Sequence, residues 1–471
     1  MSPSQLTHVP AQPLEPPPLV IVEGFLGGFG SLLKGSFEKH LNADSRGRQR
    51  RAIFASVGPV SSLHDRACEL YYAITGGTVD YGEHHARRHK HDRYGRTIEK
   101  GLYPEWSRER PLHFIGHSMG GPTITKLQWL IKTGHFGDGP TPDMILSITA
   151  VSSPFRGTPI TYTCGSSTHN APCVRPFSLG SLLAKSIHVF SYISPFLPSP
   201  SSSSLLSLFD FHIDARRSAM TCKHINLREF LQQMWKSDWA ESRDVAPYDV
   251  TFEAIDARER LVDGDGEGMV CEGTFYQSYV ACMTERIGSE TALHAPTSLF
   301  HKPTRTPLYL GARFIGSFDY SVLRPAPSFF PQSQTDDTKD SPSINADMLF
   351  PKTSSDSETE SDIEGGLRSI SRPEKGKMGQ EYWANDGVVP IFSQWHPHAC
   401  RTTTCIHYPP SQPRGVSATW LLQPGVWHVH QVDDAHHISL IPAWLGTSRQ
   451  KAFWEELGSW LQAVDDSGLR H

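Results

Sequence analysis

The chain has 471 residues, of which 38% are hydrophobic and 20% charged, enough for one large α/β domain with insertions or for two domains. Its formal net charge of −5 offers no basic surplus for a polyanion, so nucleic acid is not an expected partner. We find no membrane-length apolar run and no secretory signal pattern, so we expect no transmembrane segment and a cytoplasmic location.

Apolar runs and segments with helical spacing alternate through the first third of the chain. A Pro-rich leader at residues 1–17 is expected to be disordered. The runs suited to buried strands are residues 18–22, 51–57, 111–116 and 144–151. Helical spacing falls between them, at 63–72 and 119–131. This alternation predicts βαβ units and a mainly parallel sheet.

Two segments interrupt this pattern. Residues 176–215 are rich in Ser and Pro with apolar residues embedded among them. Residues 326–378 are rich in Ser, Pro, Asp and Glu, a composition that predicts a solvated, disordered insert. Order is expected to return at 382–389, and residues 448–464 predict a closing amphipathic helix. We therefore expect one α/β domain over residues 18–465.

The sequence Gly116-His117-Ser118-Met119-Gly120 matches the G-x-S-x-G motif between a predicted strand and a predicted helix. In that context the serine lies on a sharp turn, and small flanking residues leave room for its neighbours. The helix amino terminus adds partial positive charge that favours an oxyanion. Ser118 is therefore the predicted nucleophile.

A serine nucleophile needs a histidine base that a carboxylate orients. In α/β-hydrolases the chain order is serine, acid, histidine. Asp386, on a predicted tight turn beside an apolar strand, is the best acid downstream of Ser118. Four histidines compete as the base, and the residues alone do not choose among them: His428, His430, His436 and His437.

Several motifs together resemble the Geobacillus and staphylococcal lipases (families I.5 and I.6) and their eukaryotic relatives. These motifs are DRACE at 65–69, GGTVDYG at 76–82, the His-rich segment 85–95 and HFIGHSMGG at 113–121. The resemblance covers residues 18–160 well and 205–460 in patches. It implies an α/β-hydrolase fold and the activity of a triacylglycerol lipase or carboxylesterase.

The resemblance also implies roles for single residues. It makes Ser118 the nucleophile, Asp386 the acid and His437 the base, with the adjacent His436 as the alternative. The oxyanion hole would use the backbone N–H groups of Met119 and Phe25. Glu23 stands where the family has a histidine before the Gly-Phe pair, and a carboxylate beside an oxyanion would be unfavourable.

The resemblance further implies a structural zinc held by Asp65, His85, His91 and Asp244. Two histidines and two carboxylates make a chemically sensible closed site. The alternative is that the basic segment HHARRHKH is only a solvated loop. Calcium is not expected, because Ser439 takes the place of a family carboxylate and no Asp precedes Pro442.

Residues 176–215 lie where the family carries its lid, and their apolar members would line an acyl pocket and contact a lipid interface transiently. Those members are Leu205, Leu206, Leu208, Phe209 and Phe211. They would otherwise be plain core, which leaves lipase and esterase both open. A different class of function is an inactive relative that acts as a binding or scaffold protein through the acidic insert.

The eight cysteines are scattered along a chain without a recognised signal, so reduced thiols are expected. Two pairs are close enough in sequence for a local disulfide, Cys164 with Cys173 and Cys400 with Cys405. The CxxC spacing of a thiolate zinc site is absent.

Overall fold

The protein is described by a computed structural model. It covers residues 15–27, 36–45, 48–169, 171–196, 211–260, 266–288, 293–297, 306–331, 378–408 and 422–467. The expectations for most of the leader and of the acidic insert, and for Leu205, Leu206, Leu208 and Phe209, lie outside the described residues.

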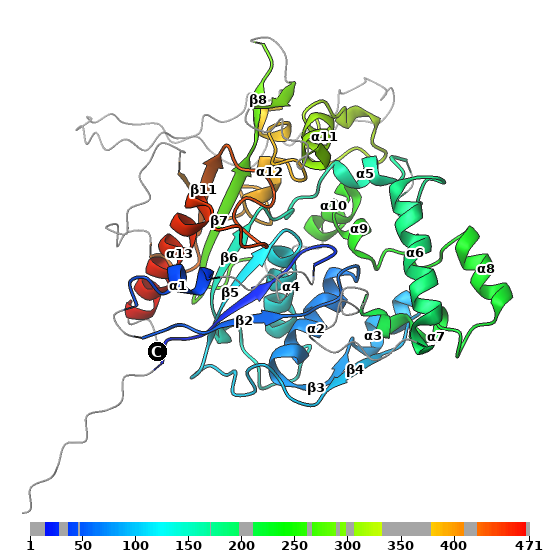
Figure 1. The fold of residues 1–471 in the computed structure, drawn as a ribbon, viewed down its shortest axis with the longest axis horizontal. Coiled ribbons are helices and arrows are strands. Elements are labelled where there is room, and N and C mark those ends of the chain that lie inside the picture. Colours follow the sequence, from blue (N-terminus) through cyan, green and yellow to red (C-terminus); the bar gives the residue numbers. More distant parts are fainter. Residues whose placement is uncertain are drawn as a thin grey trace, which may run out of the picture.

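A seven-stranded sheet runs through the centre of the molecule (Figure 1). Its strands, in spatial order, are β10 (Cys405–Tyr408), β11 (Trp427–Asp433), β7 (Phe275–Cys282), β6 (Ile145–Val151), β5 (Leu112–His117), β1 (Leu19–Val22) and β2 (Ala52–Ala55). Every neighbouring pair is parallel. The predicted mainly parallel α/β sheet is therefore confirmed, and the carboxyl ends of its strands meet at one edge.

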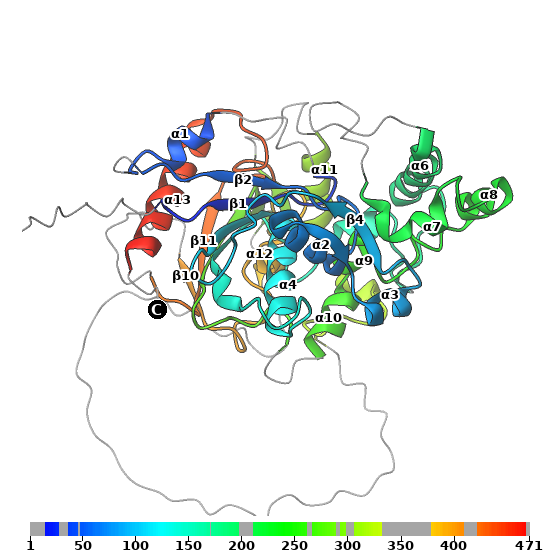
Figure 2. The same ribbon diagram turned by 90° about the horizontal axis from the view of Figure 1, so that it is seen from below.

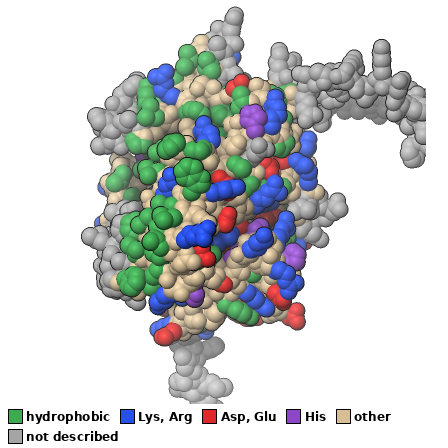
Figure 3. All heavy atoms as spheres, turned by 90° about the vertical axis from the view of Figure 1, so that its right-hand side faces the viewer, with side chains coloured by type: hydrophobic (Ala, Val, Ile, Leu, Met, Phe, Trp, Pro, Cys, Tyr) green, Lys and Arg blue, Asp and Glu red, His purple; other side chains and the backbone are tan. Residues whose placement is uncertain are grey.

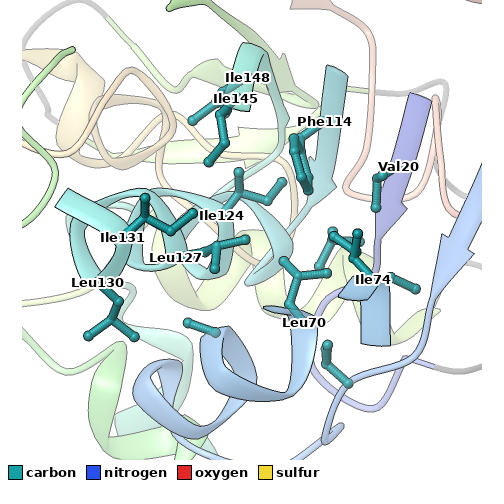
Figure 4. Packing of buried hydrophobic residues seen from close by; sticks show 14 of the residues in the cluster. Val20, Leu70, Ile74, Phe114, Ile124, Leu127, Leu130, Ile131, Ile145 and Ile148 are labelled. Atoms are coloured by element: carbon teal, nitrogen blue, oxygen red, sulfur yellow. The ribbon is translucent and has the colours of Figure 1, made fainter. Parts of the chain in front are cut away.

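Helices cover both faces of this sheet (Figure 2). The helices α2 (Leu63–Thr75) and α4 (Gly120–Lys132) pack on one face, and α1 (Phe37–Leu41) and α13 (Ser448–Asp466) on the other. Alternation along β1 divides its side chains between the two cores, with Val20 facing α2 and α4 and Ile21 facing α13. Figure 4 shows Val20 and Phe114 above the apolar face that α2 and α4 share.

The expected strands at 18–22, 51–57, 111–116 and 144–151 and the helices at 63–72, 119–131 and 448–464 all form. Three strands of this sheet were not predicted: β7, β10 and β11. In β7 the polar residues Gln277 and Ser278 interrupt the apolar pattern, yet both are buried. The Gln277 amide is satisfied by a hydrogen bond of 2.9 Å to Thr149 Oγ1, so the strand can lie inside the sheet.

The remaining elements lie around the sheet. Two hairpins are formed by β3 (Gly77–Asp80) with β4 (Tyr94–Ile98) and by β8 (Thr284–Arg286) with β9 (His294–Pro296). The other helices are α3 (Glu83–His89), α5 (Ile160–Cys164), α6 (Leu179–Ile193), α7 (Arg217–Met220), α8 (Leu227–Trp235), α9 (Ala246–Asp249), α10 (Phe252–Arg260), α11 (Thr306–Ile315) and α12 (Ile391–Gln394). Within the described ranges, none of the helices is long and apolar enough to pass through a bilayer.

Candidate active site

Ser118 lies on a sharp turn between β5 and α4, as the motif predicts. Its φ of +52° is in the left-handed region, and its N–H donates to Val151 O at 2.9 Å. The helix passes so close to β1 that a Cβ on Gly120 would lie 2.1 Å from Val22 O. A larger residue at position 120 would push α4 away from the sheet, so the glycine fixes the position of Ser118 above the helix amino terminus.

The loop after β1 runs directly against Ser118. A Cβ on Gly24 would lie 2.6 Å from Ser118 Cβ and 3.0 Å from its Oγ. Neither the backbone N–H of Phe25 nor that of Met119 donates a hydrogen bond to any residue that the structure describes. The two backbone donors that the sequence predicts therefore lie on the two segments that meet at Ser118, and both are available to a ligand.

Sequence reasoning missed the residue that holds this loop in place, Arg66 of α2. Its fully buried guanidinium donates to Glu23 O at 2.5 Å and to Gly58 O at 2.6 Å. A third bond, of 2.9 Å, reaches Thr123 Oγ1 on α4. Arg66 thus joins the loop after β1 to the helix that follows Ser118.

Arg66 also bears on the charge of Glu23. Burial lowers the pKa of Arg66 to about 10, and the carboxylates of Glu69 and Glu23 act in the opposite direction. The guanidinium therefore stays protonated at neutral pH and faces the negative charge of Glu23. In the sequence, Arg66 stands only as one of the charged residues of the DRACE motif at 65–69.

Asp386 and His437 are brought together from separate loops. Oδ1 of the buried Asp386 accepts the backbone N–H groups of Val388 at 2.9 Å and Val389 at 2.7 Å. Its other oxygen, Oδ2, lies 2.9 Å from His437 Nδ1, and the His437 N–H donates to Asp386 O at 2.9 Å. The carboxylate is thus satisfied on both oxygens and orients the ring of His437.

The other candidate histidines have different surroundings. The N–H of His436 donates to Ser439 Oγ at 2.7 Å. His428 lies within β11, where its Nδ1 is 2.9 Å from the hydroxyl of Tyr408, and burial lowers its pKa to about 4. The ring of His430 stacks on the same Tyr408, with 4.8 Å between centroids.

His437 contacts His117, the residue before Ser118. The Nε2–H of His117 donates to His437 O at 2.9 Å, and the two rings are 4.8 Å apart between centroids. Burial lowers the pKa of His117 to about 3, and the neighbouring His437 lowers it further. A neutral His117 therefore links β5 to the loop that carries His437, a contact that sequence reasoning did not foresee.

Ser118 opens onto a cavity of about 460 Å3. Most of its lining is apolar, including Phe25, Met119 and Val389 from the loops just described and Leu179 and Leu183 from α6. A second hollow of about 1360 Å3 has a charged lining that does not include Ser118. The smaller cavity is the candidate ligand site, because the predicted nucleophile lies on its wall.

The four predicted metal ligands form a second group, which we call the Asp65 group: Asp65 in α2, His85 in α3, His91 beyond α3, and Asp244 before α9. His85 Nε2 lies 3.3 Å from Asp65 Oδ1 and 3.1 Å from Asp244 Oδ1. His91 Nε2 lies 4.0 Å and 3.4 Å from oxygens of the same two carboxylates. Tetrahedral zinc would place such ligand atoms about 3.4 Å apart.

The electrostatics of the Asp65 group favour a cation. Burial raises the pKa of Asp65, and the negative charge of Asp244 raises it further. Among the described residues, Asp65 Oδ1, His85 Nε2 and His91 Nε2 are buried, and apart from the ion-pair contacts within the group they have no hydrogen-bond partner. The residues therefore fit a bound divalent metal, although Arg216 also donates to Asp244 Oδ2 at 2.9 Å.

Comparisons with known proteins show similarity to lipases. Residues 17–176 match a family described as the lipase-like, C-terminal domain. The chain is 28% identical over 368 residues to a lipase of Staphylococcus hyicus, covering 72% of this chain and 50% of that protein. Over 165 residues it is 38% identical to Lipase 1 of Staphylococcus aureus, covering 30% of this chain and 24% of the relative.

The chain thus spans half or less of the length of these relatives. The crystal structure of S. hyicus lipase superposes with a TM-score of 0.60 at 21% identity, over 98% of this chain and 97% of that one, which shows a shared fold. The sequence motifs, the family match over residues 17–176 and the shared fold agree, and the chain is similar to the staphylococcal-type lipases.

Proposed function

We propose that the protein is a serine hydrolase that cleaves carboxylic esters through an acyl-enzyme on Ser118. One observation carries the proposal: Ser118 stands on a left-handed turn at the wall of an apolar cavity, beside a loop whose histidine is bonded to a buried carboxylate. The similarity to lipases supports the same chemistry. The roles of the single residues are inferred from their positions.

In the first half-reaction, Ser118 Oγ attacks the ester carbonyl carbon while His437 Nε2 takes its proton. Asp386 stabilises the resulting imidazolium through the bond to Nδ1 and holds the ring in one tautomer. The tetrahedral intermediate then collapses, the alcohol leaves with the proton from His437, and the acyl group stays on Ser118.

In the second half-reaction His437 removes a proton from water, which attacks the acyl carbon. Collapse of this second intermediate expels Ser118, which regains its proton, and releases the carboxylic acid. Both intermediates carry an oxyanion that the N–H groups of Phe25 and Met119 would stabilise. Each such donor contributes roughly 3 kcal/mol in well-studied hydrolases, and Arg66 would keep the Phe25 donor in place.

We propose that the substrates are lipid-type esters whose acyl chain enters the cavity at Ser118, because this cavity has a mainly apolar lining. Part of that lining comes from α6, within the predicted lid segment 176–215. The adjoining surface is also apolar, and Figure 3 shows hydrophobic side chains gathered on the side of the molecule that carries α6 and α8. Its exposed members include Phe177, Leu179, Leu182, Leu227, Leu231 and Trp235. Such a patch suits transient contact with a lipid interface.

The interface contact can be tested with Leu231→Ser/Trp235→Ser, two exposed positions of α8. We expect several-fold lower activity on an emulsified triglyceride and unchanged activity on a soluble short-chain ester, because only the first substrate requires adsorption. Leu445→Ser, an exposed position outside this patch, serves as the control. Equal loss on both substrates would argue against the contact.

We also propose that the Asp65 group holds zinc. The ion would join α2 to the chain segment between α2 and β5 and to the segment before α9. Its role would be structural, because four protein ligands complete its coordination shell. No step of the ester hydrolysis depends on it.

A fluorophosphonate probe tests the central proposal. Wild type should be labelled covalently and Ser118→Ala should not, since the probe reacts with an activated serine hydroxyl. Absence of labelling in the folded wild type, or equal labelling of the variant, would favour the alternative of an inactive relative that serves as a scaffold. The expected cytoplasmic location and the expected lack of calcium and of nucleic-acid partners stay predictions.

A further inference from the structure

A third cluster of reactive side chains lies far from Ser118 in the chain, on the edge strand β10 and on the loop that joins α12 to it. We call it the Cys400 group, and it consists of His396, Cys400, Cys405 and His407. Each residue offers one ligand atom, and these atoms all lie within 4.8 Å of one another. His396 is buried, while Cys400 is exposed to solvent.

The spacing of these atoms matches tetrahedral coordination. Cys400 Sγ lies 3.5 Å from His396 Nε2 and 3.6 Å from His407 Nε2. With Zn–S near 2.3 Å and Zn–N near 2.0–2.1 Å, a tetrahedral site would hold sulfur and nitrogen about 3.6 Å apart. Two thiolates with two imidazoles form a ligand set that selects zinc over harder cations.

Both ends of the segment that carries the group are anchored to the sheet. At its start, Gln394 accepts from Ala281 N at 2.8 Å and donates to Ala281 O at 3.0 Å, so α12 is fixed to β7. At its end, β10 pairs in parallel with β11 (Figure 2). The ligands therefore converge from two fixed points across one short loop.

The loop is held mainly by polar contacts, such as His398 Nε2 with Glu267 O at 2.7 Å and Trp427 N with Thr404 O at 3.0 Å. Its sequence from 396 to 404, HPHACRTTT, contains no large aliphatic residue, so burial of apolar surface supplies little of the free energy needed to order it. All eight cysteines are free thiols in the structure, and Cys400 contacts two imidazole nitrogens. A metal cross-link would add to the polar contacts that hold this loop.

We propose that the Cys400 group binds one Zn²⁺ in a closed structural Cys₂His₂ site that fastens β10 to the end of α12. Two thiol protons pass to solvent as two Zn–S bonds form, and two neutral imidazoles complete the shell. This zinc is separate from the Asp65 group, which has no sulfur ligand. The proposal does not depend on the ester hydrolase function.

Metal analysis of the purified full chain tests the proposal. Cys400→Ser and Cys405→Ser should each lose one equivalent of zinc relative to wild type. Cys222→Ser, a partly buried thiol outside the group, should lose none. His407→Cys should retain the zinc, because a Cys₃His set is also a good ligand set. Equal zinc content in wild type and in folded Cys400→Ser would overturn the proposal.

A second measurement uses wild type alone, in case the serine variants do not fold. Replacement of zinc by Co²⁺ should produce thiolate-to-cobalt charge-transfer absorption, which the Asp65 group cannot produce. A thiol reagent should abolish this absorption as it modifies two cysteines. Absence of the absorption in the cobalt-loaded protein, or a Cys400–Cys405 disulfide found by mass spectrometry, would contradict the site.

Discussion

Two regions of the molecule combine buried aspartates with histidines, and they do so in opposite ways. Asp386 meets His437 through Nδ1, and its second oxygen is filled by two backbone N–H groups. In the Asp65 group two carboxylates meet the Nε2 atoms of two histidines, and several of these buried atoms have no hydrogen-bond partner among the described residues.

The difference is the one expected between the acid–base pair and the metal-ligand group that we propose. A satisfied carboxylate fixes one tautomer and leaves the opposite ring nitrogen of His437 to exchange a proton with Ser118 and the substrate. In the Asp65 group the corresponding nitrogens point inward, where like-charged carboxylates repel each other. A divalent cation would relieve both the repulsion and the missing hydrogen bonds.

The largest effect is expected from His437→Ala. Loss of the base should lower kcat by on the order of 10⁴- to 10⁶-fold, because His437 is the histidine that Asp386 orients in the described part of the chain. His436→Ala should keep most of the activity, since it is His437 Nδ1 that lies 2.9 Å from Asp386 Oδ2. Steady-state kinetics on a soluble ester, with folding checked by circular dichroism, measure both. A reversed result would move the base by one residue.

His85→Ala tests the other side of the comparison. Without this ligand the Asp65 group should bind zinc weakly and lose the stabilisation that zinc provides, about 4 kcal/mol when free zinc is a thousandfold above its Kd. We therefore expect a clearly lower Tm and, in the protein that is still folded, kcat within about twofold of wild type, since the metal is outside the reaction. His84→Ala is the control. A large loss of kcat without any change in Tm would reverse the assignment.

The sequence predicts the part of this comparison that depends on local pattern. The strands before Glu23 and Ser118 are short apolar runs, so the approach of the two loops follows from a parallel sheet. The sequence cannot choose between His436 and His437, because the two are adjacent in one loop. Only the path of the backbone through that loop decides which ring faces Asp386. Their catalytic roles, and that of Asp386, stay predictions.

Other features depend on contacts between distant segments and could not be read from spacing. Arg66 reaches the loop after β1 only because α2 packs beside that strand. The Cys400 group has no CxxC spacing, and its ligands converge only because both ends of the loop are anchored to the sheet. The strand β7 was missed because Gln277 finds its hydrogen-bond partner, Thr149, only inside the finished sheet.

A third buried aspartate, Asp465, also contacts a histidine, and we expect its loss to have a smaller effect than the two substitutions above. Asp465 of α13 meets His113 Nε2 at 3.1 Å and Arg50 Nη2 at 2.5 Å. Burial raises the pKa of Asp465, but the hydrogen bond and charge of His113 and the charge of Arg50 outweigh it, and the net shift is downward. A carboxyl whose pKa is lowered by folding stabilises the protein above its unfolded pKa of about 3.9.

That stabilisation is lost as the pH falls through the lower, folded pKa. Asp465→Asn should therefore cost about 2 kcal/mol of unfolding free energy at pH 7, and the difference from wild type should shrink as the pH falls below about 4. Urea unfolding of both proteins across this range measures it. A difference that stays constant with pH would mean that Asp465 acts through shape alone. In that case its charge, unlike the charges of the Asp65 group, would contribute nothing to the fold.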